Sequence, residues 1–204
     1  MATTAAPYGL RPINLIGGQS FTGGTIRKYV MTVNSATGIF FGDLVKLSDG
    51  EPSPVTATPT TSTRGIVGVC VGVSYTDPTL KYTQFSQYLP ANAVNSGYTN
   101  ILISVIDDPD QLYQVQADNS VTRAKIGNNA ELGNFSAGST TSGNSKITLE
   151  AGTIANTATF AVRIVDLVDG APTFSTPGDA YTDCIVKLNF GVHSYQQSTG
   201  SGTT

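Results

Sequence analysis

The sequence predicts an all-β protein: a small β-barrel or sandwich body with an extended N-terminal arm and long surface loops. The 22 glycines and 10 prolines are spread along the 204 residues, and the apolar runs between them are rich in β-branched residues. This pattern is typical of short strands joined by turns. Helix signals are scarce, and the one candidate, Thr83 to Val94, is interrupted by Pro90.

Apolar runs mark the expected strands in chain order. They lie at residues 25–33, 42–47, 65–75, 100–105, 112–117, 146–150, 158–167 and 183–192. A further short strand is expected directly after the turn Ser35-Ala36-Thr37-Gly38. The hairpin-type signal Ser48-Asp49-Gly50 ends the second run, and a Pro/Thr-rich surface loop follows it. The third run is almost continuously apolar, which predicts a central strand. Its glycines leave room for a bulge or for a close approach of another backbone.

The body is expected to span residues 25–195, with a polar C-terminal tail at residues 196–204 that is rich in Gly, Ser and Thr. Within the body, Gly42-Asp-Leu-Val-Lys-Leu47 is weakly similar in sequence to a later segment, Gly127-Asn-Asn-Ala-Glu-Leu132. Two interpretations therefore stay open. The body is a single unit, or it consists of two similar β units at about residues 25–118 and 119–195.

Residues 1–24 differ from the rest of the chain because they contain apolar side chains without a sustained period. The prolines in this segment oppose helix and favour extended backbone. A flexible tail would be poor in such apolar residues, so we expect an arm that binds a partner. The predicted partner-binding residues are Pro7, Tyr8, Leu10, Arg11, Pro12, Ile13, Leu15 and Ile16.

The charged fraction is 12%, whereas ordinary soluble domains have about 25%. Uncharged polar surface is less costly to dehydrate than charged surface. The composition therefore favours a chain that covers much of its surface with neighbouring subunits, and the alternative is a secreted β domain with a Ser/Thr-rich face. A net charge of −3 without a basic block argues against nucleic-acid binding. The first residues lack the basic region and apolar run of a signal peptide, and no apolar stretch reaches the length of a membrane span, so we expect neither.

Residues suited to catalysis or metal binding are sparse, so we expect no enzyme, no metal and no cofactor. The single histidine, His193, lacks a recognisable nucleophile motif. Cys70 and Cys184 lie in apolar runs, which favours buried free thiols over a disulfide. The acidic cluster Asp107-Asp108-Pro109-Asp110 is typical of a tight turn, with a calcium site as the less favoured interpretation.

Residues 76–100 form a long excursion rich in Tyr, Gln and Asn. Tyrosines in loops suit contacts between proteins, because the side chain is amphipathic and has little conformational entropy to lose. They also suit stacking on sugars, so both interpretations stay open. The possible subunit-contact residues are Tyr82, Phe85, Tyr88 and Tyr98.

Two motifs together resemble a family. The segment Pro7-Tyr-Gly-Leu-Arg-Pro12, followed by Ile16-Gly17-Gly18, and the later Gly42-Asp-Leu-Val-Lys-Leu47 resemble virion proteins of tailed bacteriophages. The order of that strand, a variable polar loop and Gly65-Ile-Val-Gly-Val69 is similar to capsid decoration, or cement, proteins of cyanophages and other marine phages. The resemblance is clearest over residues 7–75 and fades afterwards.

This resemblance implies a virion structural protein that binds the outer surface of an HK97-type major capsid protein shell and stabilises it. It also implies a homotrimer that is present in the host cytoplasm during assembly and on the outer capsid surface in the virion. The alternatives are another virion component, such as a head-fibre base or a tail subunit, or a carbohydrate-binding β domain. A major capsid protein is disfavoured because no long helix is expected.

Overall fold

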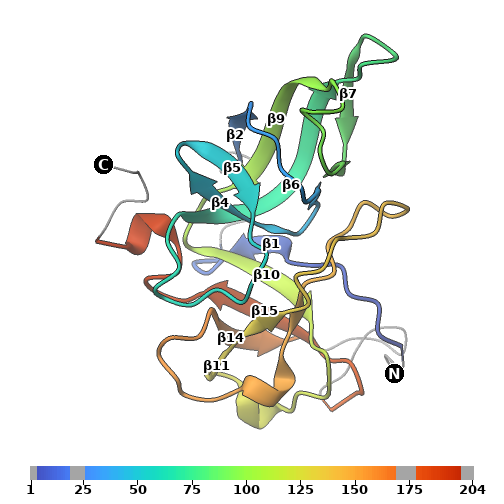
Figure 1. Ribbon diagram of the computed structural model, residues 1–204. Coiled ribbons are helices and arrows are strands. Elements are labelled where there is room, and N and C mark those ends of the chain that lie inside the picture. Colours follow the sequence, from blue (N-terminus) through green and yellow to red (C-terminus); the bar gives the residue numbers. More distant parts are fainter. Residues whose placement is uncertain (1–3, 19–25, 169–177, 199–204) are drawn as a thin grey trace.

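The computed structural model describes residues 4–18, 26–168 and 178–198 and confirms the all-β class (Figure 1). Two antiparallel sheets lie one above the other in Figure 1. The upper sheet has the order β2 (Ile26–Met31), β9 (Thr99–Ile106), β6 (Ile66–Thr76), β4 (Leu44–Ser48) and β5 (Glu51–Pro54), with β7 (Thr83–Ser86) paired to the second half of β6. The lower sheet has the order β1 (Arg11–Leu15), β10 (Gln111–Gln116), β15 (Asp183–Leu188), β14 (Val162–Leu167) and β11 (Asn129–Ala130).

Short elements complete the described chain. Two-residue strands form two further pairs: β3 (Ile39–Phe40) with β8 (Tyr88–Leu89), and β12 (Leu132–Gly133) with β13 (Thr148–Leu149). The helical elements are single 3-10 turns at η1 (Arg123–Lys125), η2 (Ala151–Thr153) and η3 (Ser194–Gln196). The helix candidate at residues 83–94 is wrong, because its first residues pair with β6 as strand β7 and Tyr88–Leu89 pair with β3.

The upper sheet curls until its two outer strands meet. The end of β2 approaches the start of β5, where the backbone N–H and the hydroxyl of Thr32 donate hydrogen bonds to the two carboxylate oxygens of Glu51, at 2.7 and 2.5 Å. This contact gives the upper sheet the form of a small barrel. Since it replaces backbone pairing between the two strands, the barrel is closed by a side chain at this point.

Two hydrophobic cores lie on the two sides of β4 and β6. Ile66 and Val69 pack into the core shared with the lower sheet, whereas Val67, Cys70 and Val73 pack into the core of the upper barrel. Because one strand serves both cores, the two sheets form one structural unit.

The division into halves at residue 118 is therefore wrong. The upper sheet is built from residues 26–106, and the lower sheet combines residues 11–15 with residues 111–188. The motif at 42–47 lies mostly in β4, whereas the similar segment at 127–132 contains only the two-residue strand β11 and the first residue of β12. The apolar pattern predicts strands in both segments, but it does not predict which sheet each strand joins.

The N-terminal segment is not an arm that leaves the body, which corrects the prediction for its described residues. Strand β1 pairs antiparallel with β10 of the same chain, and Leu10 is fully buried in the core. Just before it, Gly9 crosses Gly42 so closely that an added side chain at Gly9 would meet the Gly42 carbonyl oxygen at 2.8 Å. The Leu10 N–H donates to that same oxygen at 3.0 Å.

The physical reason is that the lower sheet has an edge that an irregular apolar strand can cover. Pro12 has no N–H to donate, which a sheet tolerates at an edge, and the register shifts between Pro12 and Leu15. The Tyr8 hydroxyl adds a hydrogen bond of 2.8 Å to Asp183. Of the eight predicted partner-binding residues, Leu10 is buried, Arg11 and Ile16 are exposed, and the other five are half-buried. Residues 1–3 and 19–24 of the predicted arm, and residues 199–204 of the predicted tail, lie outside the described residues.

We predict that Leu10→Ala lowers the free energy of unfolding by about 2–5 kcal/mol, because it leaves a cavity in the core that both sheets share. Urea unfolding followed by circular dichroism measures this change. Ile16→Ala is the matched control, since Ile16 is 51% exposed, and its effect should stay within about 0.5 kcal/mol. Equal, small effects of the two substitutions would show that the N-terminal segment is not part of the folded core.

Candidate functional site

A hairpin formed by the second half of β6 and by β7 projects from the upper end of the molecule (Figure 1). We call residues 73–86 the finger. Its turn is held by Asp77, whose carboxylate accepts hydrogen bonds from the N–H groups of Thr79 and Leu80 at 2.7 and 2.9 Å. The Asp77 carbonyl accepts from the N–H of Lys81 at 3.0 Å. These bonds give the finger a defined turn.

The finger presents large apolar side chains to solvent. Leu80 is 51% exposed, Tyr82 58% and Phe85 83%. Single exposed apolar residues are common on soluble proteins, but three of them on one ordered projection are typical of an interaction site. An ordered hairpin also loses little further backbone entropy on binding. The finger is therefore the strongest candidate contact element of the described chain.

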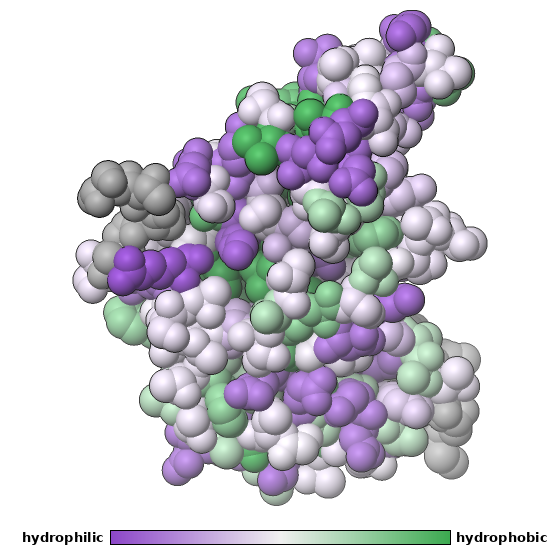
Figure 2. Space-filling view, in the orientation of Figure 1, coloured by the Kyte–Doolittle hydropathy of each residue, from purple (hydrophilic) through white to green (hydrophobic). Residues whose placement is uncertain are grey.

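Phe85 ends a row of four cross-strand neighbours on the outer face of the upper sheet, three of which are apolar. The register places Val30 of β2 opposite Leu102 of β9, Leu102 opposite Ser74 of β6, and Ser74 opposite Phe85 of β7. Val30 is 57% exposed at the other end of the row. Hydrophobic side chains gather around the ends of β2 and β9 in Figure 2, with hydrophilic ones beside them.

A shallow groove of about 430 Å³ lies beside this row. Lys28, Gly72, Ser74, Phe85 and Ser104 line it together with neighbouring residues. Gly72 keeps the groove open, because the nearest atom to a side chain added there is the Ser86 carbonyl oxygen at 3.6 Å. The lining is mostly uncharged, which suits a protein surface more than a charged small molecule.

The four predicted subunit-contact residues do not form one surface. Tyr82 and Phe85 belong to the finger, as described above. Tyr88 instead stacks on Phe40 with ring centroids 5.3 Å apart, and Tyr98 packs edge-on against Tyr75 at 5.0 Å. Tyr88 and Tyr98 thus stabilise their own chain, while a contact role for Tyr82 and Phe85 stays a prediction.

Sequence reasoning missed Leu80 and the face formed by Val30 and Leu102. The alternation in β2 and β9 was visible, but it does not tell which face of a curled sheet meets a core. The position of Leu80 beside Asp77 and Pro78 indicated a turn. That an apolar residue would lie at the exposed tip of a hairpin required the pairing of β6 with β7.

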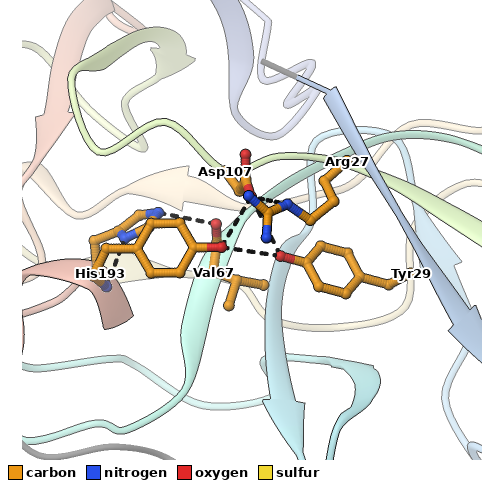
Figure 3. Close-up of polar contacts among 6 residues, drawn as sticks. Arg27, Tyr29, Val67, Asp107 and His193 are labelled. Carbon is orange, nitrogen blue, oxygen red and sulfur yellow. Dashed lines mark hydrogen bonds and ion pairs between the residues drawn. The ribbon is translucent and has the colours of Figure 1, made fainter. Parts of the chain in front are cut away.

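A connected polar cluster lies where the C-terminal turn η3 meets the edge of the upper sheet (Figure 3). Arg27 of β2 forms an ion pair of 2.7 Å with Asp107, which is 10% exposed. The hydroxyl of Tyr195 donates to the same carboxylate oxygen at 3.0 Å. Tyr29 is within 3.4 Å of both the Asp107 carboxylate and the Tyr195 hydroxyl. Since Asp107 follows β9 and Tyr195 lies in η3, the cluster fastens the C-terminal segment to the barrel.

His193 is fully buried beneath this cluster, and its hydrogen bonds define its protonation state. Its Nδ1 accepts a hydrogen bond from the backbone N–H of Tyr195 at 3.2 Å. The proton must therefore be on Nε2, which donates to the Val67 carbonyl at 2.9 Å. Burial lowers the pKa of His193, so the neutral ring is favoured. The bonds of His193 go to backbone groups, and they attach the C-terminal segment to β6.

The remaining candidates for chemistry are occupied by structural contacts. Asp110 forms an ion pair of 2.8 Å with Lys187, and the Asp108 carboxylate accepts from the Asp110 N–H at 2.8 Å, as in a tight turn. Cys70 and Cys184 are buried free thiols whose pKa burial raises to about 12, far from thiolate reactivity at neutral pH. Within residues 4–18, 26–168 and 178–198, no group of His, Cys, Asp and Glu side chains has the arrangement of a metal site.

Comparison with protein-family models, with curated proteins and with solved structures finds no match for this chain. Among the residues that the structure describes, no helix has the length and apolar character of a membrane span. The finger and the sheet face beside it are therefore the features of the described chain that point to a contact role.

We predict that His193→Gln removes one contribution to the pH dependence of stability, so that the pH profiles of wild type and variant differ in slope. The histidine pKa is lower in the folded chain than the unfolded value of about 6.5, so the unfolded chain binds more protons around and below that pH. The contribution of His193 to the free energy of unfolding should therefore fall as the pH falls through about 6.5. Urea unfolding at a series of pH values measures the difference between the two proteins.

The comparison with His193→Gln is needed because Asp43 acts in the opposite direction. Burial raises the pKa of Asp43 to about 6, so protonation of this carboxyl favours the folded chain between its unfolded pKa and about pH 6. Both proteins keep Asp43, and its contribution cancels in their difference. Parallel pH profiles of wild type and variant would contradict the assignment of a buried, neutral His193.

Proposed function

We propose that this chain is a structural protein of a tailed-phage virion that decorates an icosahedral HK97-type capsid and stabilises it from outside. It acts by contact and not by catalysis, as a homo-oligomer, expected to be a trimer, on the shell of major capsid protein. The observation that carries the proposal is the finger, an ordered projection with exposed Leu80, Tyr82 and Phe85. Projections of this kind serve assembly because they bring apolar surface into a neighbouring subunit.

The composition supports the same role. Only 12% of the residues are charged, and uncharged polar surface is less costly to dehydrate when neighbours cover it. A bound shell presents many equivalent sites, so weak contacts of linked subunits add through avidity. The described residues that resemble phage virion proteins, 7–12 and 42–47, cross each other at Gly9 and Gly42. They support the body that carries the finger.

A carbohydrate-binding function is the second candidate, and a separate groove favours it. Phe190 is 79% exposed and lines a groove of about 410 Å³ with Arg64, Gln196 and Gln197. An exposed aromatic ring beside planar polar side chains suits a sugar ring. Saturation-transfer NMR with neutral and acidic oligosaccharides, compared between wild type and Phe190→Ala, tests this candidate without any shell.

We predict that purified chain sediments with empty shells from the phage that encodes it, when these shells lack decoration protein. Electron microscopy should then show added density on the outer surface. Leu80→Ser combined with Tyr82→Ser should weaken binding by about tenfold or more, because burying each side chain is worth roughly 1.5–3 kcal/mol. Phe190→Ser is the matched control and should bind as wild type does. Sedimentation without bound chain, or rings and tubes formed without shells, would overturn the decoration function.

A further inference from the structure

The outer edges of the two sheets are protected against pairing with other chains, with one exception in the described residues. Strand β5 carries Glu51, Pro52 and Pro54, and β1 carries Pro12 and a register shift. Charges, prolines and bulges are the usual means by which proteins block an open strand edge. Of the other outer strands, β2 carries Arg27 and Lys28 and closes towards β5, and β11 is covered by backbone bonds between Asn129 and Ala155.

Strand β7 is the exception. Its sequence, Thr83-Gln84-Phe85-Ser86, contains no charge, no proline and no glycine, and its pairing with β6 is regular over all four residues. It pairs with β6 on one side only. Phe85, the most exposed large apolar residue of the described chain at 83%, lies on this bare edge. Such an edge is a template for one more strand.

We propose that β7 pairs antiparallel with β7 of a second copy of this chain, about a two-fold axis that passes beside Phe85. In this register Phe85 faces Phe85 of the second copy, and Gln84 faces Ser86. No like charges oppose each other, so the edge is complementary to itself. The row from Val30 through Leu102 and Ser74 to Phe85 then continues into the same row of the second copy.

A second copy fits this edge better than a flexible peptide does. Four residues offer few backbone hydrogen bonds, and a disordered segment would have to be ordered to form them. Strand β7 of a second copy is already ordered by its pairing with β6 and by the turn that Asp77 holds. The facing Phe85 rings add an aromatic cross-strand pair, which stabilises antiparallel pairing beyond the backbone bonds.

This inference names one partner for the assembly role proposed above, yet the isolated chain tests it. Sedimentation equilibrium across about 1–100 μM chain should show a dimer or a larger even-numbered assembly. Phe85→Lys places two like charges face to face and removes the aromatic pair, so the association should weaken by about tenfold or more. Thr83→Lys blocks the same edge without changing Phe85. Phe190→Lys is the control for an exposed phenylalanine elsewhere and should associate as wild type does.

A cysteine variant tests the register. The Cβ atoms of directly opposed residues in an antiparallel pair are about 4.5–5.5 Å apart, which is close enough for a disulfide after small adjustment. Phe85→Cys should therefore form a covalent dimer on mild oxidation, and Cys70 and Cys184 do not compete because they are buried. Tyr82→Cys should not, because the two copies of residue 82 would lie about 20 Å apart in this register.

Three results would overturn the inference: a monomer throughout the concentration range, an assembly that Phe85→Lys and Thr83→Lys leave intact, or equal cross-linking of Phe85→Cys and Tyr82→Cys. Circular dichroism and the melting temperature confirm that each variant is folded. A dimer that does not bind shells would refute the decoration function and leave the pairing of β7 intact. A chain that binds shells as a monomer would refute the pairing of β7 alone.

Discussion

The passage of β6 between two cores is the constraint on which the rest of the structure depends. Its first half separates the core of the upper barrel from the core shared with the lower sheet. At Gly68 it runs so close to β9 that an added Cβ would lie 1.7 Å from the carbonyl oxygen of Ile106. The strand continues for 11 residues, and its second half extends with β7 as the finger. The finger is thus an extension of the strand that both cores share.

The lower sheet makes the fold depend on both ends of the described chain. Strand β10 lies between β1, from the beginning of the chain, and β15, from near its end. Beyond β15, the buried His193 and the cluster around Asp107 attach the C-terminal turn to the upper sheet. These long-range pairings bring distant segments together, so we expect them to form late in folding. They also explain why an apolar N-terminal segment is compatible with a single folded chain: its partner is β10.

The strand edges of the described chain differ in how well they are protected against pairing with another chain. Prolines, charges and bulges block the edges of β1, β2 and β5, whereas the finger carries exposed apolar residues and an unblocked edge. A difference between blocked and unblocked edges determines where another chain can associate. The proposed two-fold contact through β7 would join two copies of the chain and leave the blocked edges of β1, β2 and β5 unpaired.

The sequence alone determined the all-β class and the approximate positions of the main strands. The expected strand at residues 65–75 corresponds to β6, and those at 100–105, 112–117 and 183–192 correspond to β9, β10 and β15. These could be predicted because β-branched runs between turn residues report strand character locally. The tight turn at residues 107–110 followed from the same local chemistry.

Only the tertiary structure decided which partner each segment has. Periodicity tells which residues are apolar, but not whether their own chain or another one covers them, so Leu10 was assigned to a partner and lies in the core. The same limit applies to the aromatic residues of the long excursion. Tyr88 and Tyr98 pack against aromatic rings of their own chain, whereas Phe85 is exposed. Burial depends on contacts between residues far apart in the sequence, and no local pattern encodes those contacts.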